Sequence, residues 1–370
     1  MRILAESHVF LHPPSGISRY VLGILTALRD LGARVDVLTF GGPLTVTLPP
    51  GIRWRRRQKL LGRLLQRLHR LHVFAPIDVV AGVRADAVFF TAFESLPTML
   101  VRPRIVAIYD LTFLQHPETV DEGLRKWLRS VVPRAARECE IILTISQSAA
   151  DDIARLLHVD KQRIVVASPA VDLSVFAIPN ATIRAGILER YGLEPGYFFF
   201  CSTLEPRKNL VRLLDAWASL PAPRRPLVLV GGRGWRDDVI QARLHELQRG
   251  GGLHVLGRVP DADLAALYAG AHCLVFPSLY EGFGIPILEA MACGCPVVTS
   301  NVSSMPEVAG GAAVLVDPYD ISSIAAGLVS LEDSSLRARC IEAGQVNTRR
   351  YSWRQSAQII LQAIQATKTK

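Results

Sequence analysis

Two acidic residues, Glu281 and Glu289, lie eight positions apart, with Gly-Phe-Gly and Pro286 between them. A turn with a purely structural role needs neither acid. Proline suits the first turn of a helix, where its missing N–H costs nothing. Three amides would then lack helical partners, those of Phe283, Gly284 and Ile285. Such amides bind anions, with help from the helix dipole, so the segment predicts a phosphate at a helix start.

The two carboxylates indicate what the phosphate belongs to. Glu281 precedes the expected helix and Glu289 lies one turn inside it, so each would face one side of the phosphate and accept bonds from hydroxyls. A ligand with hydroxyls on both sides of a diphosphate is a nucleotide sugar. The alternative is that Glu281 is a surface loop acid and Glu289 a solvated helix residue.

A second candidate is the pair Arg207 and Lys208, which follows the apolar run Tyr-Phe-Phe-Phe-Cys-Ser. Two cations at a helix start oppose the local dipole, so an anionic ligand would explain them. We expect them to neutralise a departing diphosphate. The alternative is a solvated basic turn.

The first half of the chain offers two further polar segments. In one, Gly16 allows backbone amides to approach a ligand and Arg19 is a candidate contact for an acceptor. In the other, Asp110 follows a strand-like run and is expected to point toward the site, and His116 is a candidate ligand or acid/base residue. An ordinary helix cap and a structural histidine are the alternatives.

Short apolar runs alternate with amphipathic stretches in both halves. The expected strands of the first half are residues 2–5, 34–40, 86–92, 105–109, 141–146 and 164–167. Those of the second half are residues 197–202, 227–231, 254–256, 273–277, 297–300 and 313–316. The expected helices are residues 17–31, 121–137, 147–157, 210–220, 235–249, 262–270, 285–293, 320–331, 334–347 and 353–366. This alternation is typical of βαβ units and parallel sheets.

The alternation occurs twice, so we expect an α/β protein with two doubly wound domains facing a cleft. The predicted boundaries are residues 1–175, 176–350, and a C-terminal helix in 351–370 that crosses back onto the first domain. Ligands of open parallel sheets bind beyond the carboxyl ends of the strands, where the candidate residues fall. No Gly-x-Gly-x-x-Gly follows the first strand, which argues against a nicotinamide enzyme.

Composition is that of an ordinary globular protein, with 49% hydrophobic and 20% charged residues among 370. There is no apolar run long enough to span a bilayer, and the N-terminus does not resemble a signal peptide, so a cytoplasmic protein is expected. The six cysteines are scattered and do not suggest a disulfide scaffold or a zinc site.

The net charge of +9 is concentrated in residues 53–72, which contain eight Lys or Arg and no acid. From residue 59 onward, leucines cover one face of a helical wheel and basic residues another. Such a helix can lie in a membrane interface and attract anionic lipid. The candidate membrane-binding residues are Arg55, Arg56, Arg63, Arg67 and Arg70. A helix docked on its own domain is the alternative, and nucleic acid is not expected because aromatic residues are not interleaved.

Together these segments resemble the retaining nucleotide-sugar glycosyltransferases of family 4, which have the GT-B fold of two Rossmann-like domains. The resemblance covers most of the chain. It is most specific in the stretches STLEPRKNL, LVGGRGW, LGRVPDADLAALYAGAHCLVFPSLYEGFGIPILEAMACGCPVV and SSMPEVAGGAAVLVDP. In the first half, GISRY and YDLTFLQHPE are similar to the branch that includes bacterial polysaccharide mannosyltransferases.

The resemblance implies roles for individual residues. Arg207 and Lys208 would bind the donor diphosphate, Glu281 the donor sugar and Glu289 the ribose. The remaining implied donor contacts are Gly16, Ser202, Arg258, Val259 and the 283–285 amides. Two positions depart from the family pattern: Tyr109, a candidate acceptor contact with Arg19 and His116, stands where many relatives have histidine, and Ser202 where glycine is common.

The implied activity is transfer of a hexose with retention of the anomeric configuration, by front-face substitution. The expected donor is GDP-mannose and the expected transferred sugar is mannose. The expected acceptor is a lipid-linked or polysaccharide chain of the O-antigen or exopolysaccharide type, used at the inner face of the cytoplasmic membrane. No cofactor or metal is expected, and Asp261 and Asp263 are interpreted as helix-capping acids rather than metal ligands. Alternatives are a UDP- or ADP-hexose donor, a sugar-nucleotide epimerase of the same fold, and a non-catalytic basic binding protein.

Overall fold

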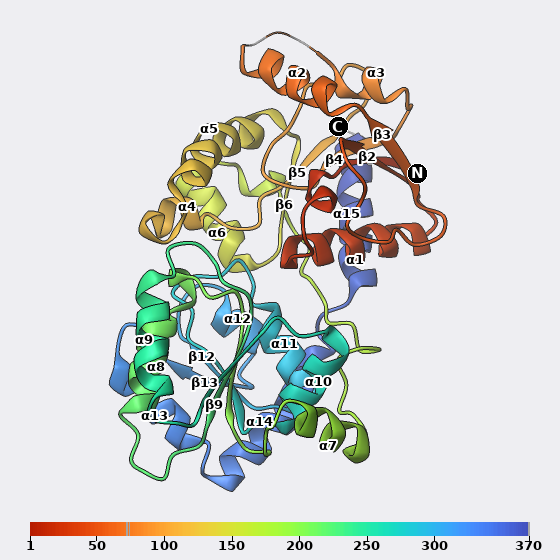
Figure 1. Ribbon diagram of the computed structural model, residues 1–370. Coiled ribbons are helices and arrows are strands. Elements are labelled where there is room, and N and C mark those ends of the chain that lie inside the picture. The colour runs from red at the N-terminus through yellow and green to blue at the C-terminus, as the bar shows by residue number, and fades with distance from the viewer. Residues whose placement is uncertain (72, 74, 369–370) are drawn as a thin grey trace. The chain divides into compact units, whose positions relative to one another are not determined.

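The computed structural model describes residues 1–71, 73 and 75–368, except for the side chain of Arg70. The chain divides into two compact units. Unit 1 contains Met1–Leu111, Gly123–Pro169 and Ser352–Lys370, and unit 2 contains Thr112–Glu122 and Ala170–Tyr351. Each unit is an α/β fold built on a parallel sheet (Figure 1).

The sheet of unit 1 has seven parallel strands in the order β3-β2-β1-β4-β5-β6-β7. The strands are β1 (Arg2–Glu6), β2 (Arg34–Phe40), β3 (Arg53–Arg57), β4 (Ala87–Phe90), β5 (Arg104–Ala107), β6 (Ile141–Thr144) and β7 (Ile164–Val166). The central strands are buried on both faces, as expected for continuous apolar runs in a parallel sheet.

The helices of unit 1 cover its sheet. They are α1 (Gly16–Asp30), α2 (Lys59–Arg70), α3 (Ile77–Ala81), α5 (Glu122–Glu138), α6 (Gln147–Leu157) and α15 (Trp353–Lys368), with short 3-10 turns at His8–Leu11 and Lys161–Arg163. Helices α1 and α15 lie side by side (Figure 1) and share one core with β1 and β2. Gly23 makes this close approach possible, because a Cβ there would lie 2.8 Å from the Trp353 ring.

The sheet of unit 2 has six parallel strands in the order β10-β9-β8-β11-β12-β13. The strands are β8 (Phe198–Cys201), β9 (Leu227–Val230), β10 (Leu253–Gly257), β11 (Cys273–Phe276), β12 (Val297–Ser300) and β13 (Val314–Val316). Strands β8, β9, β11 and β12 are almost wholly buried, and the edge strands β10 and β13 are less so.

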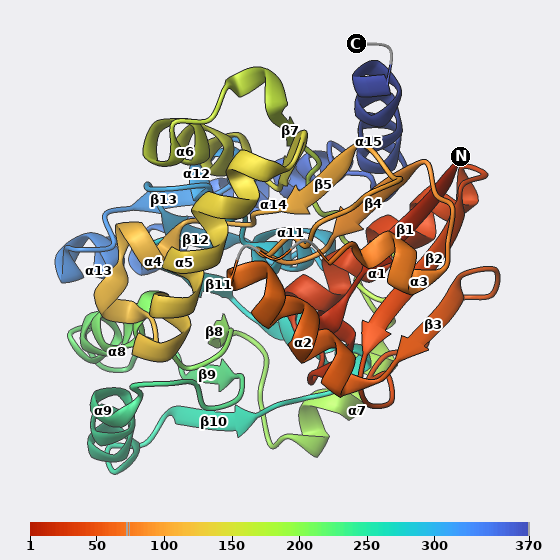
Figure 2. The same ribbon diagram turned by 90° about the horizontal axis from the view of Figure 1, so that it is seen from above.

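Helices cover both faces of this sheet. They are α7 (Ala181–Arg190), α8 (Leu210–Ala218), α9 (Asp238–Gln248), α10 (Asp261–Gly270), α11 (Ile285–Ala292), α12 (Met305–Ala309), α13 (Ile321–Ser330) and α14 (Ser334–Thr348). Helices α8, α9 and α13 share a core with β8 and β9, and α9 runs beside β10 (Figure 2). Unit 2 also contains α4 (Thr112–Gln115) and the 3-10 turns Pro117–Thr119 and Pro206–Lys208.

The expected α/β class with two parallel sheets is confirmed, and all twelve expected strands are present. Strand β3 was not predicted, because its sequence Arg-Trp-Arg-Arg-Arg lacks apolar alternation. It lies at the edge of the sheet, where basic side chains are common because they discourage pairing with another chain. Helices α3, α4, α7 and α12 were also missed; three of these are only four or five residues long.

Candidate active site

The candidate site of unit 2 lies where its sheet changes direction. The chain passes from β8 to β9 and β10 on one side, then returns to place β11 on the other side of β8. The crevice beyond the carboxyl ends of such adjacent strands is the usual ligand site of an open α/β sheet. The loop after β8 carries Arg207 and Lys208, and the loop after β11 carries Glu281.

These two loops are joined by charged hydrogen bonds. Nζ of Lys208 lies 2.6 Å from Oε1 of Glu281, and Nη1 of Arg207 lies 2.6 Å from Oε2. Arg207 also binds Glu205 at 2.8 Å through Nη2 and the carbonyl oxygen of Tyr280 at 2.7 Å. The two carboxylates and the ammonium group of this cluster are buried; they belong to Glu205, Glu281 and Lys208. The alternatives of a solvated basic turn and a surface loop acid are therefore wrong.

The charges of this cluster balance within it, two cations against two carboxylates. Burial alone would raise the pKa of Glu281, but the charges and hydrogen bonds of Arg207 and Lys208 lower it to about 2. Glu281 is therefore ionised at neutral pH. The ring of Phe276 lies 5.3 Å from Nζ of Lys208, which adds a cation–π contact below the ammonium.

The loop that carries Glu281 is fixed by two serines after β12. The hydroxyl of Ser303 donates to the Glu281 carbonyl at 2.7 Å and accepts from its amide at 3.2 Å. The hydroxyl of Ser304 donates to the carbonyls of Glu281 and Phe283, at 2.9 and 2.8 Å. These serines were not singled out from the sequence, since serine after a strand has many ordinary roles.

Helix α11 begins as predicted at the glycine-rich segment, with Pro286 in its first turn. Gly284 is the N-cap at a φ of +104°, a conformation that side chains other than glycine rarely adopt. Phe283 is buried edge-on against Tyr351, with 5.3 Å between the ring centroids. Phe283 and Ile285 therefore flank a fixed helix start, and their amides remain candidate phosphate ligands.

Glu289 is buried in α11, which excludes the alternative of a solvated helix residue. The hydroxyl of Tyr268 donates to its Oε2 at 3.0 Å. A buried carboxylate with a fixed orientation is suited to accept hydrogen bonds from hydroxyl groups. Its expected role toward a ribose stays a prediction.

The loops after β8, β9 and β10 pack tightly beside this cluster. Gly231 has a φ of +147°, and a Cβ there would lie 1.8 Å from the carbonyl oxygen of Ser202. A Cβ on Gly232 would lie 2.8 Å from Nε of Arg258. The backbone of Ser202 can lie this close to the loop after β9 because residue 231 of that loop is a glycine. A serine at position 202 is therefore compatible with the tight packing. Val259 is half-buried next to Arg258.

The segment that contains His116 packs within unit 2. Its imidazole ring lies 5.7 Å from the ring of Tyr280, the residue whose carbonyl binds Arg207, and Nδ1 lies 3.2 Å from Oε1 of Glu118. The indole of Trp235 donates to the carbonyl of Thr119 at 2.7 Å. His116 therefore adjoins the charged cluster, a neighbourhood that its sequence position did not reveal.

The other candidates of the first half lie in unit 1. Gly16 is the first residue of α1, after an N-cap at Ser15 that exchanges hydrogen bonds with Ser18, so the ordinary capping alternative is realised there. Arg19 follows in the first turn of α1, and Asp110 lies half-buried after β5.

Tyr109 is corrected as an acceptor candidate. It is buried in the core of unit 1, and its hydroxyl donates to the carbonyl of Thr91. Its ring packs edge-on against Tyr20 and Phe93, with centroid distances of 5.5 and 5.6 Å. A tyrosine at this position completes the core rather than offering its hydroxyl to a ligand.

Asp261 and Asp263 lie in the first turn of α10, as predicted, but the capping role of Asp263 is wrong. The Asp263 carboxylate is buried and accepts from Nη1 of Arg190 at 3.0 Å and from the Tyr191 hydroxyl at 2.8 Å. The Asp263 carboxylate therefore joins the C-terminal end of α7 to the first turn of α10. Within the described ranges, no group of three or more His, Cys, Asp or Glu side chains is placed to hold a metal ion.

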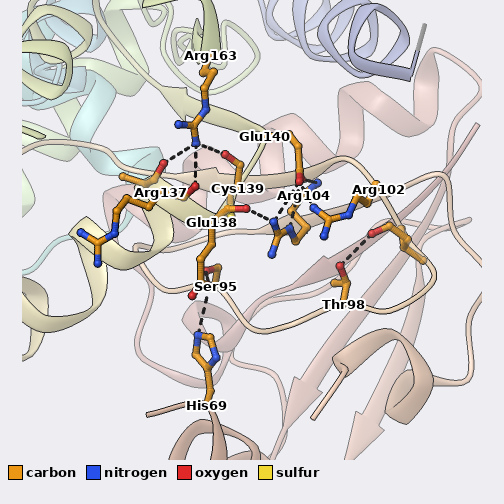
Figure 3. Close-up of polar contacts among 12 residues, drawn as sticks. His69, Ser95, Thr98, Arg102, Arg104, Arg137, Glu138, Cys139, Glu140 and Arg163 are labelled. Atoms are coloured by element: carbon orange, nitrogen blue, oxygen red, sulfur yellow. Dashed lines mark hydrogen bonds and ion pairs between the residues drawn. The ribbon is translucent and has the colours of Figure 1, made fainter. Parts of the chain in front are cut away.

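Helix α2 is docked on unit 1 along one face. Leu65 and His69 are buried, and a Cβ on Gly62 would lie 2.5 Å from Cβ of Phe40. Nε2 of His69 lies 3.5 Å from Oε2 of Glu138 at the end of α5 (Figure 3). Oε1 of the same carboxylate accepts a hydrogen bond from Nε of Arg134 at 2.8 Å. Burial alone would raise the pKa of Glu138, but His69 and Arg134 lower it to about 2.

A second face of α2 remains exposed. Leu60 and Leu64 are 75% and 49% exposed, and Leu71 after the helix is 73% exposed. On the wheel these three leucines form one stripe, next to the exposed side chains of Arg63 and Arg67. The docked-helix alternative is therefore correct for half of the leucine face, and the other half is exposed among the residues that the structure describes.

Two other arginines of the basic segment make contacts inside unit 1. Arg55 lies in β3 and binds the buried Asp36 at 2.6 Å, and Arg56 donates to the carbonyl of Gly41 at 2.7 Å. The side chain of Arg70 lies outside the described part. Over the residues described, no helix combines the length and apolar character needed to cross a bilayer.

The two parallel sheets, with a charged cluster at the switch point of the second, define the class of GT-B glycosyltransferases. Two family models match the chain, Glycosyltransferase Family 4 over residues 14–175 and Glycosyl transferases group 1 over residues 189–346. The sequence is 33% identical to O-antigen chain mannosyltransferase B of Escherichia coli over 95% of this chain and 96% of that protein. It is 24% identical to O-antigen chain mannosyltransferase RfbU of Salmonella typhimurium, over 86% and 87%.

Solved structures agree on the fold. Anabaena HepE, in complex with UDP and glucose, aligns with a TM-score of 0.78 at 20% identity over 99% of each chain. WaaG, a glycosyltransferase involved in lipopolysaccharide biosynthesis, aligns with a TM-score of 0.71 at 17% identity over 97% of this chain and 98% of that one. The chain belongs to glycosyltransferase family 4.

Proposed function

We propose that this glycosyltransferase moves mannose from GDP-mannose onto a lipid-linked or polysaccharide acceptor of the O-antigen type. The observation that supports a nucleotide-sugar donor is that Arg207 and Lys208 both bond to Glu281 at the switch point of unit 2. The likeness in sequence to two O-antigen chain mannosyltransferases supports the choice of mannose and of the acceptor class. Unit 2 would bind the donor and unit 1 the acceptor.

The cluster suits a diphosphate leaving group. An ammonium group donates up to three hydrogen bonds, so Lys208 can hold Glu281 and still donate to phosphate oxygens, with Arg207 fixing the same carboxylate. The amides at the start of α11 would add further donors. Charges fixed in a buried site stabilise a developing anion without reorganising, which is the main way such sites lower a barrier.

In the proposed reaction, the bond between the anomeric carbon and the diphosphate breaks while a bond to the acceptor oxygen forms on the same face. The acceptor hydroxyl gives its proton to the departing phosphate oxygen. Glu281 would orient the donor sugar and Glu289 would bind the ribose hydroxyls. Asp110, Arg19 and Gly16 stay candidate contacts contributed by unit 1.

The proposal includes independence of metal ions and of any cofactor. Hydrogen-bond donors of Lys208, Arg207 and the α11 amides would stabilise the departing diphosphate in place of a divalent cation. Asp263 of the Asp-Ala-Asp sequence is engaged by Arg190 and Tyr191. Turnover in excess EDTA is expected to equal turnover in untreated buffer. Restoration of a lost activity by Mg²⁺ or Mn²⁺ would contradict this part.

The proposal also places the enzyme at the inner face of the cytoplasmic membrane. The exposed leucines of α2, with Arg63 and Arg67 beside them, are suited to insert at the interface of a bilayer that carries anionic lipid. A lipid-linked acceptor is held at the same surface. Arg55 and Arg56, which lie in β3, would contribute through their positive charge.

A thermal-shift panel of GDP-mannose, UDP-glucose and ADP-glucose tests the donor. A donor at 100 times its dissociation constant stabilises the folded protein by about 2.7 kcal/mol, so the preferred nucleotide should give the largest shift. GDP-mannose is expected to stabilise the wild type and to have a much smaller effect on Lys208→Ala. A larger shift with a uridine or adenine nucleotide would replace the guanine assignment, and epimerised nucleotide sugar released without an acceptor would replace the reaction.

A further inference from the structure

Tyr268 and Glu289 form a buried pair between two neighbouring helices of unit 2. Tyr268 lies near the C-terminal end of α10, Glu289 lies one turn inside α11, and both side chains are buried. The Tyr268 hydroxyl donates to Oε2 of Glu289 at 3.0 Å. A buried carboxylate without a hydrogen-bond donor is costly, so this bond lowers the cost of placing Glu289 inside the protein.

The ring of Tyr268 is held in place by aromatic neighbours. It packs edge-on against Phe199 of β8, with 5.1 Å between the ring centroids, and against Phe176, with 6.3 Å. The thiol of Cys201, at the end of β8, is hydrogen-bonded to the Tyr268 hydroxyl. Burial raises the pKa of Tyr268 well above its ordinary value, and Cys201 and Glu289 raise it further, so the hydroxyl keeps its proton. The Tyr268 hydroxyl is therefore a fixed donor on a fixed ring.

The Tyr268 hydroxyl differs from the partners of Glu281 in carrying no charge. Glu281 is held by the cations of Arg207 and Lys208, which offset its negative charge. A neutral donor fixes the orientation of a carboxylate without cancelling its charge. Hydrogen bonds to an ionised carboxylate are roughly twice as strong as those between neutral groups. Tyr268 thus leaves intact the charge that helps a carboxylate to bind ribose hydroxyls.

We propose that Tyr268 is a positioning residue of the donor site, which fixes the Glu289 carboxylate in the orientation that accepts hydrogen bonds from the ribose of the nucleotide. The proposal rests on the ribose role given to Glu289 in the proposed function and deepens it by naming the residue that sets its geometry. Tyr268 is 0% exposed, so it acts through Glu289 rather than on the nucleotide itself. Loss of its hydroxyl should therefore weaken recognition of the ribose and leave recognition of the base and the diphosphate unchanged.

The test compares two nucleotides on the full-length protein by titration calorimetry. One is GDP, and the other is its 2′,3′-dideoxy analogue, which lacks the hydroxyls that Glu289 would bind. Wild type is expected to prefer GDP. Tyr268→Phe should weaken GDP binding about tenfold, as expected for one hydrogen bond to a charged group, and should weaken dideoxy-GDP binding much less. In turnover, this variant should raise the KM for GDP-mannose with little change in kcat, because the ribose contact is the same in the ground state and the transition state.

Tyr197→Phe is the matched control. Tyr197 is also a buried tyrosine of unit 2, and its hydroxyl donates to the carbonyl of Leu267, the residue before Tyr268, at 2.7 Å. The substitution removes a buried hydrogen bond to the same helix, so it should lower the melting temperature and leave the preference for GDP unchanged. Tyr268→Phe combined with Glu289→Gln should bind GDP no more weakly than Glu289→Gln alone, because the hydroxyl acts only through that carboxylate.

The outcomes separate this inference from the proposed function. An unchanged preference for GDP in Tyr268→Phe, with the preference lost in Glu289→Gln, would overturn the positioning role and leave the ribose role intact. Equal weakening of both nucleotides by Tyr268→Phe would show a structural role alone and would also overturn it. A wild type without the preference, or a preference that survives in Glu289→Gln, would refute the ribose role of Glu289 and the positioning role with it. If the thermal-shift panel selects uridine or adenine, the matching diphosphate and its dideoxy analogue replace the guanine pair, because the ribose is common to all three.

Discussion

Lys208 and Glu281, which lie 73 positions apart in the sequence, are joined by a hydrogen bond of 2.6 Å between two buried charged groups. The bond ties the loop after β8 to the loop after β11 at the switch point of unit 2. Removing one member of a buried pair leaves the other charge without compensation, which typically costs about 3–5 kcal/mol. The stability of unit 2 and the donor chemistry that we propose therefore involve the same two side chains.

The first prediction concerns turnover. Lys208→Ala and Glu281→Gln are each expected to lower kcat by about 10²–10³, because a fixed charge next to the leaving group is lost or misplaced. Initial rates at saturating donor and acceptor provide the measurement. Arg339→Ala removes an exposed cation from α14 and should leave the rate unchanged. Near-normal kcat for either site variant would refute its assignment.

The second prediction concerns pH. The folded-state pKa of Glu281 is about 2, below the ordinary value of 4.5, so its ionised form stabilises the fold. This contribution is complete above the ordinary pKa and is lost as pH falls toward 2; roughly 2 kcal/mol should be gone by pH 3. The difference in melting temperature between wild type and Glu281→Gln should therefore narrow from pH 7 to pH 3. A constant difference would show that the Glu281 charge does not stabilise unit 2.

The third prediction concerns the loop after β9. Gly231→Ala would place a Cβ 1.8 Å from the Ser202 carbonyl oxygen, at a φ of +147°. The loop must shift, so both the stability of unit 2 and donor affinity are expected to fall. Gly186→Ala is the control, since a Cβ at this position in α7 meets nothing within 4 Å. The control should be neutral or stabilising by up to about 1 kcal/mol in urea denaturation. Equal denaturation midpoints for the two variants would contradict the prediction.

The fourth prediction concerns α2. Wild-type protein should co-sediment with vesicles that contain anionic lipid and much less with neutral vesicles. Leu60→Ser with Leu64→Ser removes the apolar stripe, and Arg63→Gln with Arg67→Gln removes the charge; each pair should reduce binding several-fold. Leu100→Ser is the control, because Leu100 is a comparably exposed leucine of unit 1 outside α2. Binding that ignores lipid charge would remove the membrane proposal.

Much of the fold was predictable because burial in a parallel sheet demands long apolar runs, and such runs are visible in a sequence. The run Cys273–Phe276 is an example, and the Gly-Phe-Gly-Ile-Pro segment marked the start of α11 by turn chemistry alone. The charged residues of unit 2 were identified by type and spacing, although the sequence could not show that Glu281 neutralises Arg207 and Lys208.

Other features depend on tertiary context that no local pattern carries. Strand β3 is held by ladder bonds to β2 and by the pair between Arg55 and Asp36, so its own composition gives no strand signal. Tyr109 directly follows a strand, a position where ligand contacts are common. Its hydroxyl instead donates a hydrogen bond to the carbonyl of Thr91. The hydrogen bond between Tyr268 and Glu289 joins two helices, and no local pattern in either helix indicates it.

Helix α15 packs on elements that precede it by more than 300 residues. Its Ala357, Ile360 and Ile364 pack against α1 and β1, and the hydroxyl of Ser356 donates to the carbonyl of Ser168 at 2.6 Å. During synthesis, unit 1 therefore cannot complete its hydrophobic core until α15 has left the ribosome, more than 300 residues after β1. Unit 2, whose residues end at Tyr351, has no such dependence on α15 and is free to fold first.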